Sequence, residues 1–83
     1  MKDQDIRISI NQIERLLMFD YDASSEGALF DICDTNGRIV KTGEVARHRT
    51  RVRLTDLDGQ EFVLMVLDGE VSMVKPFQLR KVA

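Results

Sequence analysis

Short apolar runs that alternate with polar residues constrain this chain more than any other feature of its sequence. In the middle of the chain, Ala28, Phe30 and Ile32 recur at every second residue, which is the spacing of a β-strand with one face turned inward. Asn36-Gly37 follows this run and precedes another apolar pair. Asn-Gly between two apolar runs indicates a hairpin, because a type I′ turn requires positive φ at both central residues. The sequence therefore predicts a tight central β-hairpin with a type I′ turn.

The same alternation predicts strands on both sides of this hairpin. The expected extended segments are 6–10, 16–21, 28–34, 38–42, 51–57, 61–67 and 71–75, with a loop at 46–50. Asp58-Gly59 and Asp68-Gly69 are two further turn signals. Gly43 is expected to break or bulge its strand. Pro76 lacks an N–H donor, so we expect the last strand to lie at a sheet edge, with Phe77 and Leu79 closing the core.

One segment has two interpretations. Asn11-Gln12-Ile13-Glu14 matches a capping box, which would open a short helix that runs through Met18. The alternative, which we prefer, is a turn into a strand that directs Leu17, Phe19 and Tyr21 to one side.

Six or seven short strands separated by Gly and Asx turns predict an all-β fold. The expected architecture is a small antiparallel immunoglobulin-like β-sandwich. A length of 83 residues predicts one domain that spans residues 1–83. Cys33 is the only cysteine, so no disulfide within the chain can support this thin core.

Composition restricts the partners and the compartment. A formal charge of −2 is too close to neutral for the surface as a whole to bind nucleic acid or a membrane. No apolar run approaches the ~20 residues of a membrane-spanning helix. The first five residues, 1–5, are polar and no apolar stretch of a signal peptide follows them. If the chain is complete, we expect it to be cytoplasmic. If it is the C-terminal part of an exported protein, we expect it to be secreted or at the cell surface.

Residues capable of catalysis or metal binding are few. An enzyme would need a pocket that gathers His48, the only histidine, with an acid and Cys33. The sequence favours a protein that is not an enzyme and that needs no cofactor or metal. Asp20-Tyr21-Asp22 and Asp56-Leu57-Asp58 carry the oxygen ligands that Ca²⁺ prefers. Aspartate also favours turns, and we prefer that interpretation.

The cluster Arg47-His48-Arg49-Arg51-Arg53 is the only concentrated charge. Arginine binds phosphate or an acidic partner through its planar fork of donors. No aromatic residues are interleaved, so the sequence favours a solvated loop and a strand whose outward face carries Arg51 and Arg53.

The strand expected at 61–67 is apolar on both faces. One alternate set of side chains, which begins with Phe62, fills the sandwich, and the other set needs cover. That second set consists of Val63, Met65 and Leu67. Methionine suits adaptable contacts, so we predict a partner surface here. Cover by an N-terminal segment or a short helix is the structural alternative.

Four segments of the chain, in order, resemble one family. Ile32-Cys33-Asp34-Thr35-Asn36-Gly37-Arg38-Ile39-Val40 resembles the "iyDxxGrxv" hairpin of the C-terminal sorting domains of type IX secretion cargo in Bacteroidetes. Residues 53–57, 62–66 and 74–77 resemble that family's later strands and its terminal Lys-x-Phe segment. The prolines that flank the family's asparagine are replaced here by Ile10 and Gln12.

The resemblance implies a non-catalytic module that the type IX outer-membrane machinery recognises. Recognition would use shape and an edge strand, whose free N–H and C=O groups pair with the partner. The partner contacts that it implies are Gly37 and Arg38 in the hairpin, and Lys75, Phe77, Arg80 and Lys81 near the end of the chain. The alternative is a free-standing cytoplasmic β-sandwich that forms a homodimer, or binds another protein, through Val63, Met65 and Leu67.

Overall fold

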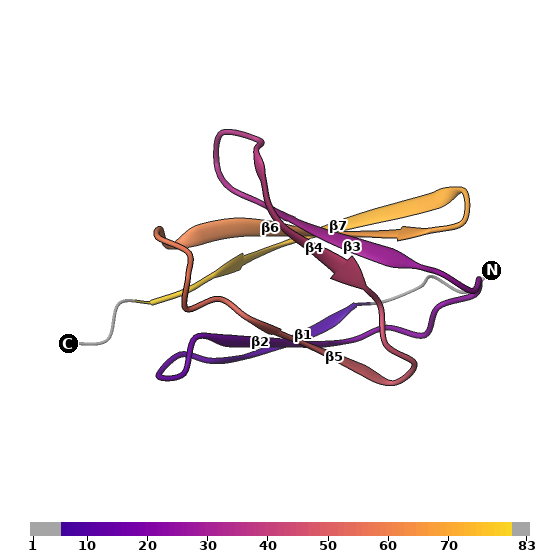
Figure 1. Ribbon diagram of the computed structural model, residues 1–83, viewed down its shortest axis with the longest axis horizontal. Helices are drawn as coiled ribbons and strands as arrows, with labels where there is room; N and C mark the ends of the chain where they lie inside the picture. The colour runs from indigo at the N-terminus through magenta and orange to yellow at the C-terminus, as the bar shows by residue number, and fades with distance from the viewer. Residues whose placement is uncertain (1–5, 81–83) are drawn as a thin grey trace.

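A computed structural model describes residues 6–80, which form seven β-strands and no helix. The strands are β1 (Arg7–Asn11), β2 (Leu16–Asp20), β3 (Leu29–Cys33), β4 (Ile39–Glu44), β5 (Arg49–Arg53), β6 (Glu61–Asp68) and β7 (Val71–Gln78). They pair antiparallel in two sheets, ordered β1-β2-β5 and β4-β3-β6-β7. Figure 1 shows these sheets as two layers. The predicted all-β antiparallel sandwich is confirmed, and the finer immunoglobulin-like topology stays a prediction.

Both sheets turn alternate side chains into one shared core. Leu17 and Phe19 of β2 are fully buried, as are Leu64 and Val66 of β6. Phe19 meets Phe30 of the other sheet edge-to-face, with ring centroids 5.6 Å apart. Each such side chain contributes about 1.5–3 kcal/mol when it leaves water, so this alternation drives folding. The described residues include no helix of the length and apolarity needed to cross a membrane.

The segment between β1 and β2 forms a turn and not a helix. The Glu14 N–H donates to Asn11 Oδ1 at 3.1 Å, and Arg15 adopts a φ of 51°. β2 buries Leu17 and Phe19, and Tyr21 directly after it is also buried, so all three point to one side as the preferred interpretation predicted.

The central hairpin forms, but the predicted type I′ turn is wrong. Positive φ occurs at Gly37 (81°) and not at Asn36. The Gly37 N–H donates to the Asp34 carbonyl at 3.1 Å, and the Asp34 N–H donates to the Arg38 carbonyl at 2.9 Å. Asp34 Oδ1 also accepts the N–H groups of Asn36 and Arg38. This aspartate side chain stabilises a longer turn with a bulge opposite Cys33, because it accepts two backbone N–H groups of the turn.

Gly43 does not break its strand, contrary to the prediction. It lies within β4 opposite Phe30, and a Cβ atom at this position would lie 2.8 Å from the Phe30 ring. The glycine therefore gives the aromatic ring room in the core while the backbone continues the strand.

Two further boundaries differ from the prediction. β5 begins at Arg49, inside the expected loop, and it ends at Arg53, well before Leu57. The chain turns after β5, where the Leu57 N–H donates to the Leu54 carbonyl at 3.2 Å. Pro76 does lie on an edge strand, because β7 ends the four-stranded sheet, and Phe77 and Leu79 are buried.

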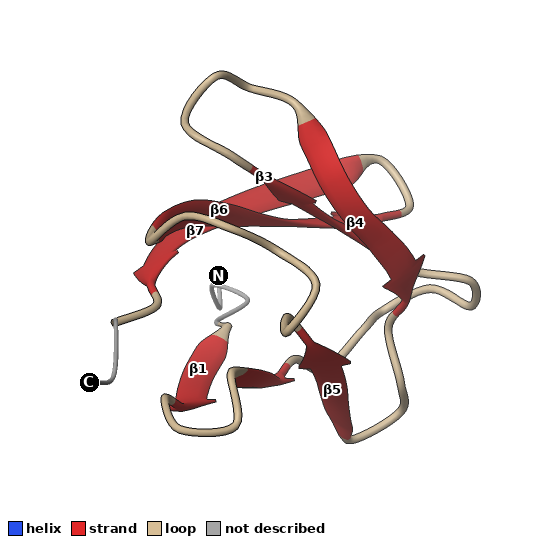
Figure 2. Cartoon of the chain, turned by 60° about the vertical axis from the view of Figure 1, so that its left-hand side comes forward, coloured by secondary structure: helices blue, strands red, loops and turns tan. Residues whose placement is uncertain are grey.

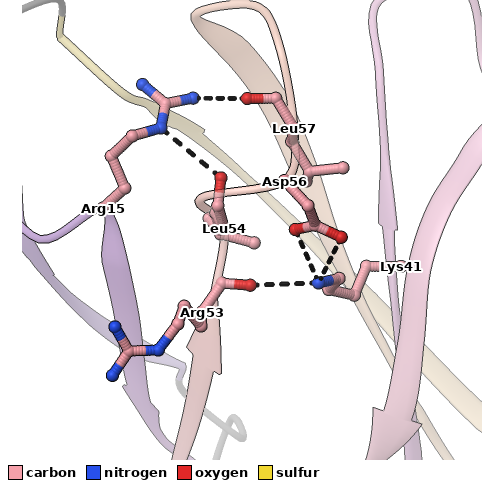
Figure 3. A network of polar contacts seen from close by, with 6 residues as sticks. All are labelled: Arg15, Lys41, Arg53, Leu54, Asp56 and Leu57. Carbon is pink, nitrogen blue, oxygen red and sulfur yellow. Dashed lines mark hydrogen bonds and ion pairs between the residues drawn. The ribbon is translucent and has the colours of Figure 1, made fainter.

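Long basic side chains hold the turn after β5 in place (Figure 3). Arg15 donates to the carbonyls of Leu54 and Leu57 at 3.4 and 2.9 Å. Lys41 Nζ, from β4, donates to the Arg53 carbonyl at 3.0 Å and pairs with Asp56 at 2.9 Å. Its hydrogen bond holds the pKa of Asp56 below the usual value. Lys41 thus joins the edges of the two sheets on this flank.

Candidate protein interface

The outer face of the four-stranded sheet is set by the alternation in β3 and β6. Phe30 and Ile32 point into the core, so Leu29, Asp31 and Cys33 point away from it. Cross-strand partners share a face of a sheet, which extends this surface over the other three strands.

This outer face is largely apolar, and we call it the apolar face. Its apolar side chains are Leu29, Cys33, Ile39, Val63, Met65, Leu67, Val74 and Pro76. Ile39 and Val74 are each 61% exposed and Leu29 is 44% exposed. In Figures 1 and 2 the three-stranded sheet lies on the opposite side, and the β3–β4 loop is the part of the described chain that rises on this side of the sheet. A continuous apolar surface of this kind is typical of a binding site.

Every ionisable strand residue on the apolar face is acidic, apart from the thiol of Cys33. Asp31, Glu44 and Glu61 lie on it, whereas the two lysines of this sheet point to the other side. Lys41 and Lys75 belong to that other side because their cross-strand partners are the core residues Ile32 and Leu64.

Asp31 lies in the middle of this surface. It is half-buried on an interior strand, between Thr42 of β4 and Met65 of β6. Within residues 6–80 its side chain has no hydrogen-bond donor and no basic partner. A carboxylate among apolar side chains is costly to desolvate unless it is paired, so a protein that covered this face would have to supply a donor or a cation.

A shallow cavity of about 320 Å³ opens at one end of the apolar face. Its lining residues are Asp34, Thr35, Glu61, Phe62, Val63, Pro76, Phe77 and Gln78. The cavity lies beside the outward side chains of Val63 and Pro76, so it can receive an apolar side chain of a protein bound to the apolar face.

The predicted partner-binding residues fall into three groups. Val63, Met65 and Leu67 lie together, half-buried, on the apolar face. Gly37 and Arg38 are exposed in the β3–β4 loop.

The group near the end of the chain is occupied with internal contacts. Phe77 is buried in the core and stacks on Phe62 at a centroid distance of 5.7 Å. Lys75 Nζ donates to the Ile6 carbonyl at 2.9 Å, and the Arg80 N–H donates to Gln12 Oε1 at 2.7 Å. These contacts attach the end of β7 to the other sheet. Lys81 lies outside the described residues.

The opposite side of the molecule is basic, and we call it the arginine face. It is the outer face of the three-stranded sheet, where Leu16 and Met18 are flanked by Arg7, Arg49, Arg51 and Arg53. Asp20 also lies there and pairs with Arg49 at 2.7 Å, which holds the pKa of Asp20 below its usual value. The guanidinium groups of Arg7, Arg51 and Arg53 have no carboxylate partner within the described part of the chain.

The structure does not bring the histidine and the cysteine together. His48 lines an open depression of about 420 Å³ with Arg7, Asp20, Tyr21, Asp22 and Arg47. Cys33 lies on the apolar face of the other sheet.

Among residues 6–80, no three histidine, cysteine or acidic side chains are placed to hold a metal ion. The two aspartate pairs that carry possible calcium ligands contribute Asp20 and Asp56 to ion pairs with Arg49 and Lys41.

The sequence pattern singles out only Val63, Met65 and Leu67 on this face as partner contacts, and it does not single out, among others, Asp31, Ile39, Val74 and Pro76. Asp31 is recognisable as outward-facing from its alternation with Phe30 and Ile32. The other three become part of the surface only through strand pairing, which no local pattern specifies.

The sequence was compared with protein-family models and with curated proteins, and neither comparison finds a match.

Proposed function

We propose that this protein is a non-catalytic protein-binding module and that the apolar face is its binding surface. The observation that carries the proposal is a continuous sheet face in which apolar side chains as exposed as Ile39 and Val74 surround the carboxylate of Asp31, which has no partner within residues 6–80. Burial of this surface supplies affinity, at about 25 cal/mol for each Å² of apolar area removed from water.

The chemistry of the apolar face specifies its partner. Asp31, Glu44 and Glu61 provide only negative charge, so a favourable partner is apolar and carries a basic side chain above Asp31. Arginine suits this position because its guanidinium group forms two parallel hydrogen bonds with one carboxylate.

Peptide binding tests the proposal directly. In an extended peptide every second side chain shares a face, so acetyl-Val-Thr-Arg-Thr-Val-amide presents two valines and one arginine together. In an NMR titration we expect it to shift the amide signals of Asp31, Met65 and Val74. The matched peptide with Glu in place of Arg should bind more weakly. An equal response to both peptides, or no response at these residues, would contradict the proposal.

The Asp31→Asn variant is the matched control for the charge. It keeps the shape of the side chain and removes the negative charge, so the preference for the Arg peptide over the Glu peptide should disappear. The Glu26→Gln variant removes the charge of an exposed residue in the β2–β3 loop, away from this face, and should keep the preference.

A second candidate function is sorting by the type IX secretion machinery, which follows from the resemblance to that family's C-terminal domains. It is favoured by an edge strand, β7, near the end of the chain, because an edge strand offers unpaired backbone groups to a partner. Gly37 and Arg38 in the exposed β3–β4 loop are the other contacts that this function would use. In this case the protein acts as the C-terminal part of an exported chain.

A fusion of residues 1–83 to an exported reporter in a Bacteroidetes host tests this second function. Sorting predicts that the reporter reaches the cell surface or the medium and that Arg38→Glu reduces its release. Retention of the reporter in the periplasm would rule it out.

A further inference from the structure

We infer that the partner of the apolar face is a second copy of this chain, which docks through its arginine face. The inference rests on the proposed function, because it identifies the partner of the same binding surface. It follows from the chemistry of the two outer faces, which lie on opposite sides of one sandwich (Figure 1).

The two faces are complementary in charge. The strand residues of the apolar face include three acids and no base, and those of the arginine face include four arginines and one aspartate. Each face also has a methionine near its middle, Met65 on one and Met18 on the other. Among the residues that the structure describes, an apolar surface with an unpaired carboxylate is therefore matched, on the same chain, by an apolar surface with unpaired guanidinium groups.

The spacing of the key side chains is also complementary. Asp31 pairs across the strands with Met65, and Arg51 pairs across the strands with Met18. Both pairs thus span neighbouring strands, which lie about 4.8 Å apart in any sheet. When two sheets pack face to face at about 10 Å, Arg51 of one copy can meet Asp31 of the next while Met18 meets Met65.

Pairing of identical faces lacks this complementarity. Two apolar faces in contact would bring Asp31, Glu44 and Glu61 of one copy near the same acids of the other. Two arginine faces would bring like charges together in the same way. Like charges across an interface cost several kcal/mol, so the contact between unlike faces is favoured over the symmetric dimer.

Contact between unlike faces has a structural consequence. Each docked copy keeps one unoccupied face on its far side, so the next copy can add in the same way. Such a head-to-tail contact between opposite sides of a molecule generates an open stack and not a closed dimer. The protein is therefore expected to form a series of oligomers that grows with concentration and is weakened by salt.

Sedimentation velocity of the full chain, over a range of concentrations at low and at high ionic strength, tests this inference. We expect the mean mass of the wild-type protein to rise with concentration beyond that of a dimer. Arg51→Glu and Asp31→Lys should each weaken association by about tenfold or more, because each places like charges together. Glu26→Lys makes a matched charge change at an exposed residue of the β2–β3 loop, outside both faces, and should leave association unchanged.

A mixture of the two face variants provides the decisive test. The Arg51→Glu chain keeps an intact apolar face and the Asp31→Lys chain keeps an intact arginine face. Their equimolar mixture should form extended oligomers although neither variant does so alone, because the two intact faces pair with each other and the two substituted faces again carry opposite charges. A chain that carries both substitutions restores an opposite-charge pair and should again form extended oligomers, which also shows that both variants fold.

Two results would overturn the inference. One is a wild-type protein that stays monomeric at every concentration at low ionic strength. The other is a closed dimer that Arg51→Glu does not affect. If the Arg peptide binds the apolar face and the protein stays monomeric, the proposed function holds and only the choice of a second copy fails. If the peptide also fails to bind, the proposed function itself fails.

Discussion

The hydroxyl of Tyr21 donates a hydrogen bond of 2.6 Å to Asp68 Oδ2, although the two residues are 47 positions apart. Both side chains are buried: Tyr21 is 3% exposed and Asp68 is 2% exposed. Tyr21 directly follows β2 and Asp68 is the last residue of β6, so this hydrogen bond joins the two sheets at one end of the sandwich.

Asp68 also organises the loop that follows Tyr21. Its carboxylate accepts the backbone N–H groups of Ser24 and Ser25 at 2.8 and 2.9 Å, and the hydroxyl groups of both serines. These hydrogen bonds compensate a charged group for its removal from water. The hydrogen bond from the Ser24 N–H makes the largest contribution to lowering the pKa of Asp68. Together, these hydrogen bonds hold that pKa well below its usual range.

The first prediction is that Asp68→Asn destabilises the protein by about 3 kcal/mol, because an amide leaves buried donors without acceptors. The change places an NH₂ group where the carboxylate now accepts the N–H groups of Ser24 and Ser25. Urea unfolding followed by circular dichroism measures the free energy of unfolding. Asp58→Asn, in an exposed turn, should have little effect. Equal stabilities of the two variants would contradict the role assigned to Asp68.

The second prediction concerns acid. The pKa of Asp68 is lower in the folded protein than its ordinary value of about 3.9 in the unfolded chain. Its contribution to stability is therefore complete above about pH 5 and is lost as pH falls through the ordinary pKa towards the folded one. The free energy of unfolding of the wild-type protein should decrease steeply below about pH 4. The Asp68→Asn variant should show a shallower decrease, and an identical slope would contradict the prediction.

The third prediction concerns alkali and Tyr21. Burial, and then the hydrogen bond to Asp68, raise the pKa of Tyr21 to about 12. The unfolded chain loses this proton near pH 10, so stability is complete below about pH 10 and falls as pH rises towards 12. Tyr21→Phe should cost about 1–2 kcal/mol at neutral pH through the lost hydrogen bond. It should also remove much of the alkaline decrease, and urea unfolding at a series of pH values measures both effects.

The fourth prediction is that Gly43→Ala destabilises the protein by about 1–3 kcal/mol through overpacking. The added methyl group would lie 2.8 Å from the Phe30 ring, and that ring is held against Phe19. Phe30→Leu removes the ring atoms that clash, so Gly43→Ala should cost much less in the Phe30→Leu background. Thermal unfolding of the four chains in this cycle gives the coupling energy. Additive effects would show that the clash is not the cause.

Local alternation predicts the strands because the pattern is set only by whether each side chain points to the core or to solvent. Leu17 and Phe19, for example, are inward in the sequence pattern and buried in the structure. Turn details depend on side chains that compete for backbone groups. Asn36-Gly37 has the composition of a two-residue turn, but the Asp34 carboxylate accepts two backbone donors and favours a longer one.

The candidate site is less accessible from the sequence, because it depends on contacts between distant segments. Alternation places Asp31 and Met65 on outward faces, but their pairing follows from the strand order. Asp68-Gly69 has the composition of a simple turn, whereas Asp68 is a buried acceptor for residues more than 40 positions away. Phe77 suits both a core and a contact role by composition, and only the packing against Phe62 distinguishes them.

The fifth prediction separates the core face of β6 from its apolar face by truncating two adjacent residues. Leu64 is fully buried, so Leu64→Ala should cost about 2–5 kcal/mol of stability. Met65 is half-buried on the apolar face, so Met65→Ala should cost less than about 1.5 kcal/mol and should instead weaken binding of the Arg peptide. Urea unfolding and the peptide titration, performed on both variants, measure the two properties separately. A Met65→Ala protein that binds the peptide as the wild type does would exclude the apolar face as the binding surface, because Met65 lies beside Asp31 at its centre.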